Sequence, residues 1–248
     1  MKRTNFLQIT ALAGLGISLL PSLSLAAEMQ SNFTRSQLIG KGNPDIIGNS
    51  YTSKMHKEAK SAFLKMKNAA AEAGIQIEVV SAYRSFQRQK EIFEGKYTRF
   101  TNQGLTPIQA IEKIIEYSTI PGTSRHHWGT DIDIIDGGAS PRPKSVLQPE
   151  LFHGKGPFCK LKEWLNDHAT DFGFYEVYTD NANRKGFKYE PWHFSYAPVS
   201  KPMLQEYKKL DLKQILLEEK IKGAAHFTDA FITKYRTENV LDINPDLL

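Results

Sequence analysis

The chain has 248 residues, of which 40% are hydrophobic and 24% charged, and its formal net charge is +5. These values are ordinary for a soluble globular protein of one or two domains, and the mild charge, with no run of basic and aromatic residues, argues against a nucleic-acid partner. The single cysteine, Cys159, excludes an internal disulfide and a thiolate metal site, so any metal must bind to His and carboxylate ligands.

Residues 1–26 have the pattern of a secretory signal peptide. Lys2 and Arg3 form a basic start, an apolar run follows, and small residues at positions 24 and 26 offer a cleavage site. The apolar run is too short for a membrane span. We therefore expect an exported protein, either periplasmic, extracellular or associated with the cell wall, with no stable membrane insertion after cleavage.

The following segments predict helices and short strands in turn. Apolar residues recur at helical spacing over 55–73, and a β-rich run over 75–83 predicts a strand. Ser85 can cap a helix that ends at Gly95, and the pair Thr106-Pro107 can begin another. His56, which lies among Lys and Glu on the first of these helices, is predicted to be solvated at the surface.

The second half of the chain predicts further short elements. The run DIDII at 131–135 predicts a strand, residues 137–147 a loop, and residues 160–169 a helix. Two strand-like segments flank a turn at 180–185, and residues 201–222 predict a charged helix. This mixture favours an α+β fold. We expect a catalytic domain over 27–200 and a helical C-terminal extension over 201–248.

The stretch SRHHWGTDIDIID, residues 124–136, is rich in potential metal ligands. In a strand, Asp131 and Asp133 share one face, and the isoleucines between them face the core. A glycine turn precedes the strand, so His126 can fold back toward Asp133 and share an ion with it. The pattern alone does not separate His126 from His127.

The segment EPWHF, residues 190–194, supplies a third ligand group. Alternation places its aromatic residues inward and leaves His193 on the other face. Two histidines, one carboxylate and an open fourth position form the ligand set of a catalytic zinc, and Glu190 is a candidate for the base that acts on the zinc-bound water. Strand alternation would turn Glu190 away from His193, but Pro191 can break the alternation.

A third segment, SAYRSFQRQ at 81–89, lies at the end of a predicted strand. Arg84 is placed to reach into a cleft from this position. Its guanidinium could bind a substrate carboxylate or a developing oxyanion.

Together, these three segments resemble the VanY-type D-alanyl-D-alanine carboxypeptidases, zinc peptidases that share a fold with D,D-dipeptidases and the hedgehog signalling domain. The resemblance covers roughly residues 50–197. It implies an antiparallel sheet that cradles one zinc ion, with flanking helices. The family patterns Ser-x-His-x-x-Gly-x-x-x-Asp and Glu-x-x-His match Ser124, His126, Gly129 and Asp133, then Glu190 and His193. The implied ligands are His126 rather than His127, together with Asp133 and His193.

The resemblance also implies roles for other residues. Glu190 would be the catalytic base, and Arg84 would stabilise the oxyanion or anchor the peptide. We expect Tyr83, Gln89 and Ser124, which match family segments, to bind substrate. Asp131 replaces a small residue of the family and is also expected to bind substrate, with tuning of the site or simple hydration as alternatives. Arg125 and His127 are further departures.

The implied activity is removal of terminal D-alanine from peptidoglycan stem peptides. An L,D-carboxypeptidase and a peptidoglycan endopeptidase of the same fold are alternatives, and loops at 137–157 and 178–186 would decide among them. A non-catalytic domain that binds cell-wall peptides is a further alternative, but it would not need the base Glu190.

Overall fold

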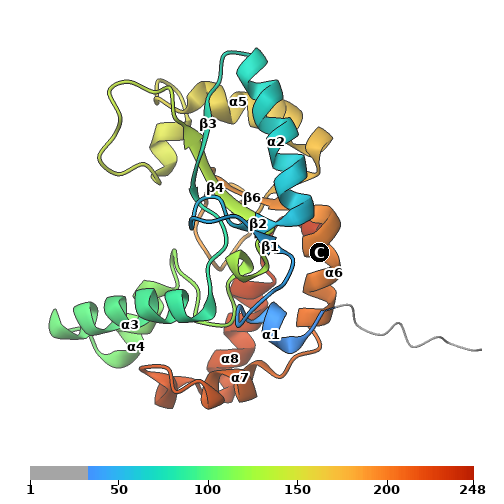
Figure 1. The fold of residues 1–248 in the computed structure, drawn as a ribbon. Coiled ribbons are helices and arrows are strands. Elements are labelled where there is room, and N and C mark those ends of the chain that lie inside the picture. Colours follow the sequence, from blue (N-terminus) through green and yellow to red (C-terminus); the bar gives the residue numbers. More distant parts are fainter. Residues whose placement is uncertain (1–32) are drawn as a thin grey trace, which may run out of the picture. The chain divides into compact units, whose positions relative to one another are not determined.

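An antiparallel sheet of four strands lies at the centre of the fold (Figure 1). The computed structural model describes residues 33–248, so the predicted signal peptide lies outside the described residues. The strand order is β3-β4-β6-β5, and a small second sheet pairs β1 with β2. The strands are β1 (Ile46–Ile47), β2 (Met55–His56), β3 (Ile77–Ser81), β4 (Asp131–Asp136), β5 (Phe174–Glu176) and β6 (His193–Tyr196). The predicted α+β class is confirmed.

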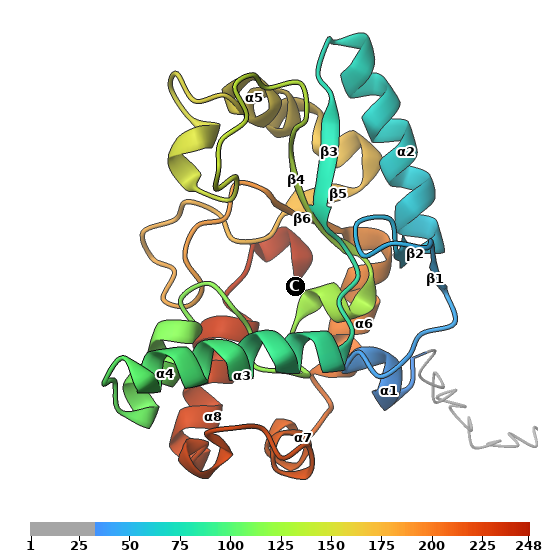
Figure 2. The same cartoon turned by 60° about the vertical axis from the view of Figure 1, so that its left-hand side comes forward.

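Two helices cover one face of the four-stranded sheet. Ile132 and Ile134 of β4 are fully buried there, in one cluster with apolar residues of α2 (Lys57–Glu72) and α5 (Cys159–His168). Figure 2 shows α2 running alongside β3. The alternation of DIDIID thus commits one face of β4 to the core and leaves the aspartates on the other face.

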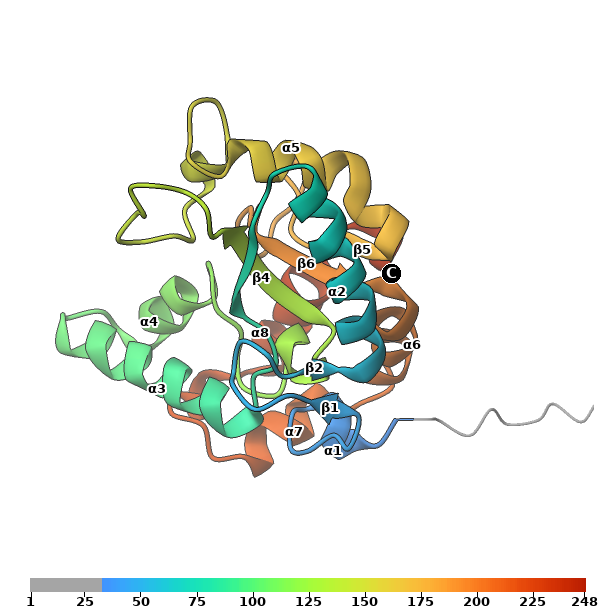
Figure 3. The ribbon, with the colours of Figure 1, turned by 45° about the horizontal axis from the view of Figure 1, so that its top comes forward.

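Two further helices, α3 (Phe86–Asn102) and α4 (Pro107–Ile114), lie side by side (Figures 1 and 3). Ser85 caps α3 as predicted, because its Oγ accepts the Arg88 N–H at 3.2 Å. The predicted end at Gly95 is wrong, since the helix runs through this glycine to Asn102. Gly95 can be accommodated because a single glycine costs a helix only about 1 kcal/mol.

The C-terminal part forms several helices rather than one. The predicted helix over 201–222 is divided between α6 (Ala197–Tyr207) and α7 (Leu212–Glu218), because Asp211 caps a new helix by accepting the Gln214 N–H at 3.0 Å. Helix α8 (Asp229–Tyr235) follows in the C-terminal part, whereas the short helix α1 (Arg35–Leu38) lies near the start of the described residues. Short helical turns occupy Arg125–Trp128, Pro149–Phe152, Ala169–Phe172, Ala224–His226, Arg236–Val240 and Pro245–Leu247.

The predicted C-terminal extension shares a core with the rest of the described chain. Leu216 and Tyr235 are almost fully buried, in the same cluster as Phe86 and Trp128. The residues from 201 onward therefore belong to the same packed body as the sheet. No helix in the described part of the chain has the length and apolar character that a membrane crossing requires.

Two local predictions need correction. The last predicted strand begins only at His193, because residues 177–192 form an irregular connection between β5 and β6. His56 is not solvated but only 4% exposed. Its backbone N–H donates to the Gly129 carbonyl at 2.8 Å, and its Nδ1 accepts the Glu58 N–H at the start of α2.

Candidate metal centre and active site

The pairing of β4 with β6 brings the acidic and histidine segments together. In this antiparallel register Asp133 lies opposite His193, and Asp131 lies opposite Ser195. On its other side, Asp133 is the register partner of Ser81 in β3. Because alternate residues share a face, all of these side chains lie on the face of the sheet that is turned away from Ile132.

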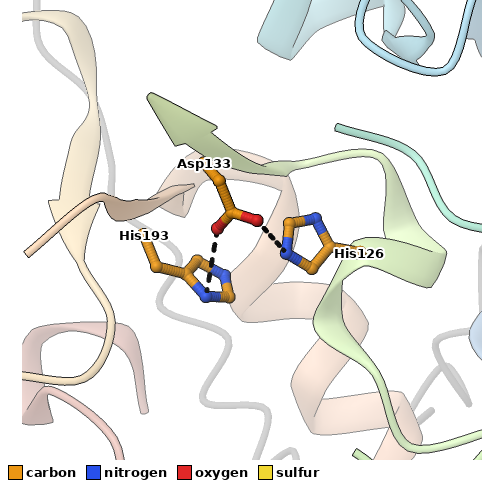
Figure 4. A group of neighbouring side chains, drawn as sticks. All are labelled: His126, Asp133 and His193. Atoms are coloured by element: carbon orange, nitrogen blue, oxygen red, sulfur yellow. Dashed lines mark ion pairs between the residues drawn. The ribbon is translucent and has the colours of Figure 1, made fainter. Parts of the chain in front are cut away.

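The turn before β4 returns His126 to the strand. Residues Arg125–Trp128 form a single 3-10 turn that ends at Gly129, whose φ of 70° is left-handed. A Cβ at Gly129 would lie 2.8 Å from the backbone nitrogen of His56, so the left-handed turn favours glycine here. His126 Nδ1 bonds to the Ala82 carbonyl at 2.8 Å, and its Nε2 lies 3.4 Å from Asp133 Oδ2. Figure 4 shows this pair beside His193.

His193 is held from both ring nitrogens. Nε2 lies 3.1 Å from Asp131 Oδ1, while Nδ1 lies 3.0 Å from Glu190 Oε2 and 3.7 Å from Asp133 Oδ1. Burial by itself lowers the pKa of His193, but the bonds to Asp131 and Glu190 and the charge of Asp133 raise it to about 10. The three carboxylates thus create a site that strongly favours positive charge.

His126, Asp133 and His193 fit a small divalent cation. All three are buried, and one potential ligand atom from each lies within 4.8 Å of the others. Asp133 Oδ1 is buried without a hydrogen-bond partner in the described structure. A tetrahedral zinc ion with bonds of ~2.1 Å places its ligand atoms about 3.4 Å apart. His126 Nε2 lies 3.4 Å from Asp133 Oδ2, and His193 Nδ1 lies 3.7 Å from Asp133 Oδ1, so each histidine is near this spacing from the carboxylate. Imidazole and carboxylate are donors that zinc prefers.

The structure separates the two adjacent histidines. His127 is fully buried, its Nδ1 bonds to the Arg84 carbonyl at 2.6 Å, and its Nε2 accepts the Gly122 N–H at 3.1 Å. Burial lowers the pKa of His127 to about 3, so the ring is neutral. With both nitrogens engaged by the backbone, His127 has no lone pair to offer a metal.

Glu190 lies beside the candidate metal site because its segment is not a strand. Residues 187–192 are irregular, and the His193 N–H donates to the Glu190 carbonyl at 3.0 Å in a turn around Pro191. This turn brings both side chains to the same side, which strand alternation would have prevented. Glu190 Oε2 thus lies 3.0 Å from Nδ1 of His193, one of the candidate ligand atoms.

A cavity of about 540 Å³ opens onto these residues. Arg84, Lys96 and Arg125 supply positive charge to its lining, and Glu150 and Glu190 supply negative charge. Ser124 also lines the cavity, as expected for a residue in contact with substrate. Leu147, Gln148 and Pro149 form part of the opposite wall, within the predicted loop at 137–157.

Arg84 lines the cavity, and two hydrogen bonds orient its guanidinium. Its Nη1 donates to Gln89 Oε1 at 2.9 Å, and its Nη2 donates to Ser81 Oγ at 3.1 Å. Gln89 is fully buried and donates its own Nε2 to the Thr119 carbonyl at 2.6 Å. The structure therefore corrects the expected substrate contact of Gln89, whose amide instead orients the guanidinium of Arg84.

Two other expected substrate contacts are not in the cavity. Tyr83 turns away from it, and its hydroxyl donates to the Gly40 carbonyl at 3.4 Å. Asp131 is fully buried, and its carboxylate is bonded to Arg125 and His193. Burial would raise the pKa of Asp131, but the charge of Arg125 and the bond to His193 hold it well below its usual range.

The sequence analysis assigned no role to three residues that lie near the site. Arg125 and Ser195 contact Asp131, and Lys96 lines the cavity from α3. The position of Lys96 could have been predicted from the sequence, because Gln89, Phe93 and Lys96 share one helix face at spacings of four and three residues. The contact of Ser195 with Asp131 could be predicted only from the register of β4 and β6, which places the two residues opposite each other.

The model of the VanY family, described as D-alanyl-D-alanine carboxypeptidase, matches residues 52–199. The chain belongs to this family. The match contains all three candidate ligands and Glu190, and it ends before the helices α7 and α8. The predicted family is thus confirmed, while the individual residue roles stay predictions.

Individual proteins of known sequence or structure are similar to this chain. A D-alanyl-D-alanine carboxypeptidase of Enterococcus faecalis is 29% identical over 154 residues, which make up 62% of this chain and 52% of that protein. The chain thus spans about half of that relative. The crystal structure of a vancomycin resistance D,D-pentapeptidase VanY with Zn(II) has a TM-score of 0.50 and 24% identity, covering 70% of this chain and 90% of that one. The LD-carboxypeptidase LdcB has a TM-score of 0.51 and 25% identity, covering 73% and 79%.

Proposed function

We propose that this VanY-family protein is a zinc-dependent carboxypeptidase that removes terminal D-alanine from peptidoglycan stem peptides. One observation carries the proposal: two histidines and an aspartate converge, with Glu190 3.0 Å from His193, at a cavity of about 540 Å³. The family match supports the same reaction.

His126 Nε2, Asp133 and His193 Nδ1 would hold the zinc ion. When bound, zinc supplies a Lewis acid for the scissile carbonyl and lowers the pKa of a coordinated water. Glu190 accepts the proton of the attacking water and returns it to the leaving amine. Arg84, held by Gln89 and Ser81, donates to the oxyanion that develops on the carbonyl oxygen.

The cavity suits a peptide that ends in a carboxylate. Lys96 lies in its wall, and none of the ion pairs among the described residues includes it. Burial and the neighbouring charges of Arg84 and Arg99 lower the pKa of Lys96, although the charge of Glu190 acts in the opposite direction. A substrate carboxylate would relieve this unpaired charge, which supports an anionic peptide as the ligand.

The reaction is tested with the purified protein and defined muropeptides, with and without a chelator, and the products are identified by mass. Loss of one D-alanine from the pentapeptide alone is the expected result. Loss from the tetrapeptide alone would make the protein an L,D-carboxypeptidase, and an internal cut would make it an endopeptidase. Zinc binding without any cleavage would make it a cell-wall-peptide-binding domain.

The substitution Glu190→Gln tests the base. It keeps the size and hydrogen bonding of the side chain but removes the proton acceptor, so we expect kcat to fall at least 100-fold while zinc stays bound. Metal content by atomic spectrometry and kcat from D-alanine release are the two measurements. Full activity with zinc bound would exclude Glu190 as the base.

A substrate of this kind places the protein outside the cytoplasmic membrane. Peptidoglycan is extracytoplasmic, and the predicted signal peptide at 1–26 provides a route of export. Export is tested by fractionation of cells that produce the full chain, with N-terminal sequencing of the mature protein. An N-terminus near residue 27 outside the membrane is expected, and an uncleaved cytoplasmic protein would contradict it.

A further inference from the structure

Asp131 is the centre of a buried polar cluster that supplies none of the candidate ligand atoms of the metal site. Each carboxylate oxygen has two partners. Oδ1 is bonded to Arg125 Nε at 2.8 Å and to His193 Nε2 at 3.1 Å. Oδ2 accepts from Thr130 Oγ1 at 2.7 Å and from Ser195 Oγ at 2.9 Å. The acceptor capacity of this carboxylate is therefore fully used within the protein.

Arg125 and Ser195 close this cluster. Arg125 Nη2 donates to Ser195 Oγ at 2.7 Å, so the serine hydroxyl is oriented to donate to Asp131. Arg125 is 4% exposed, and Asp131 and Ser195 are fully buried. A buried carboxylate needs a compensating charge, and the guanidinium supplies it. The negative charge of Asp131 is thus balanced locally, separately from Asp133 and Glu190.

The cluster determines which nitrogen of His193 carries a proton. Nε2 faces only the carboxylate of Asp131, which accepts but cannot donate, so Nε2 must be protonated. The lone pair of the neutral ring is then on Nδ1, the atom that faces Asp133 and Glu190. A carboxylate in this position also makes the other ring nitrogen a better metal ligand.

We propose that Arg125, Asp131 and Ser195 are positioning residues that hold His193 in the Nδ1-coordinating tautomer and raise its affinity for the metal. This inference rests on the proposed metal function of His193. It replaces the expectation that Asp131 binds substrate. It also explains why Asp131 and Arg125 occur together, because the aspartate would be an unpaired buried charge without the arginine.

The substitution Asp131→Asn tests the proposal without substrate. We expect the zinc dissociation constant, measured by competition with a chromophoric chelator, to rise about 10- to 100-fold. The visible spectrum of the cobalt-substituted protein should change, because the orientation and basicity of one ligand change. In the zinc-loaded wild type, ¹⁵N spectra of labelled histidine should show a ring that is protonated at Nε2 and bound to zinc through Nδ1, and this signal should shift in the variant.

Glu176→Gln is the matched control. Glu176 is also a carboxylate in an ion pair, with Lys162 at 3.0 Å, and its side chain is 17% exposed, but it lies opposite Phe194 in the register and so on the other face of the sheet. Its loss should lower stability without changing zinc affinity or the cobalt spectrum. Wild-type zinc affinity in Asp131→Asn, with a stability loss like that of the control, would make Asp131 merely structural and overturn the proposal.

If the Asp131→Asn protein does not fold, the substitution Ser195→Ala tests the same proposal. It removes one neutral donor from Asp131 and leaves the ion pair with Arg125 in place. A several-fold loss of zinc affinity with retained folding is expected, and unchanged affinity would overturn the proposal. Because zinc binding is measured without peptide, failure of the proposed peptidase activity would be seen separately, as intact metal binding without cleavage.

Discussion

His126 and His127 are neighbours in the chain, but their rings have different surroundings. His126 keeps Nε2 free toward Asp133, whereas His127 uses both nitrogens to join Arg84 to the turn at Gly122. The convergence of His126, Asp133 and His193 could be predicted from alternation and the family motif. The positions of Gln89 and Asp131 could not, because their partners, Thr119 and Arg125, are identified only by tertiary packing.

At the residue scale, Lys96→Met tests recognition of the substrate carboxylate. The variant keeps the length of the side chain but removes the charge. Loss of one charge-assisted hydrogen bond should raise KM for the pentapeptide about tenfold, with kcat little changed. Steady-state kinetics provide the measurement.

The control for this prediction is Lys65→Met. Lys65 is exposed on α2, the helix that covers the other face of the sheet. It should leave KM as in the wild type. Equal KM values in the two variants would show that Lys96 does not contact the substrate.

Among the elements, helix starts were more predictable than helix ends. Ser85 and Thr106 are local caps that accept backbone N–H groups of their own first turns, so the sequence around them is sufficient. The end of α3 was missed because Gly95 resembles a stop signal, whereas burial of neighbouring Phe93 favours a continuous helix. The late start of β6 depends on the turn at Glu190, which alternation does not reveal.

Gly95→Ala should stabilise α3. Gly95 is helical and exposed, and a Cβ there would meet no atom within 4 Å. Alanine lowers the backbone entropy of the unfolded chain, so the free energy of unfolding should rise by about 0.5–1 kcal/mol. Urea unfolding provides the measurement. Gly104→Ala, just after the helix at φ 94°, should instead destabilise, and equal effects of the two changes would contradict this account.

The start of α2 should be sensitive to pH. His56 Nδ1 must be unprotonated to accept the Glu58 N–H, and burial lowers the pKa of His56 although Asp45 opposes the shift. The unfolded chain therefore takes up a proton first, so stability is complete above about pH 6.5 and falls below it, by at most ~1.4 kcal/mol per pH unit.

His56→Asn should flatten this dependence, because asparagine also caps helices but does not titrate. Unfolding in urea at pH 7.5 and pH 5.5 compares the two proteins, in which all other titrating groups are the same. We expect the wild type to lose more stability than the variant over this interval, because only the wild type takes up this proton on unfolding. Parallel losses would mean that His56 is not the titrating group.

On the scale of the whole described body, the C-terminal helices contact the turn that leads into the candidate metal site. The Tyr207 hydroxyl donates to the Gly122 carbonyl at 2.9 Å, and the Tyr235 hydroxyl accepts the Ile120 N–H at 3.0 Å and bonds to Thr123 Oγ1. These contacts hold the turn that leads into the motif at Ser124. They could not be predicted, since they join residues more than 80 positions apart.

Tyr235→Phe should therefore impair both stability and catalysis. The buried N–H of Ile120 would lose its acceptor, which costs about 1–3 kcal/mol of unfolding free energy. We also expect kcat to fall several-fold, because the turn before His126 is less constrained. Tyr51→Phe, at a side chain 65% exposed, should change stability by less than about 0.5 kcal/mol. A Tyr235→Phe protein as stable and active as this control would refute the supporting role.

The two walls of the cavity differ in how they are held. One wall, around residues 117–126, is attached to the core through buried tyrosines, whereas the other, at residues 147–150, follows a long loop without helix or strand. During evolution, the amino acids of these two walls should be replaced at different rates. Substitutions at 147–150 can alter which peptide is accepted while the metal chemistry persists, so new specificities in this lineage should arise on the loop side and leave the histidine side unchanged.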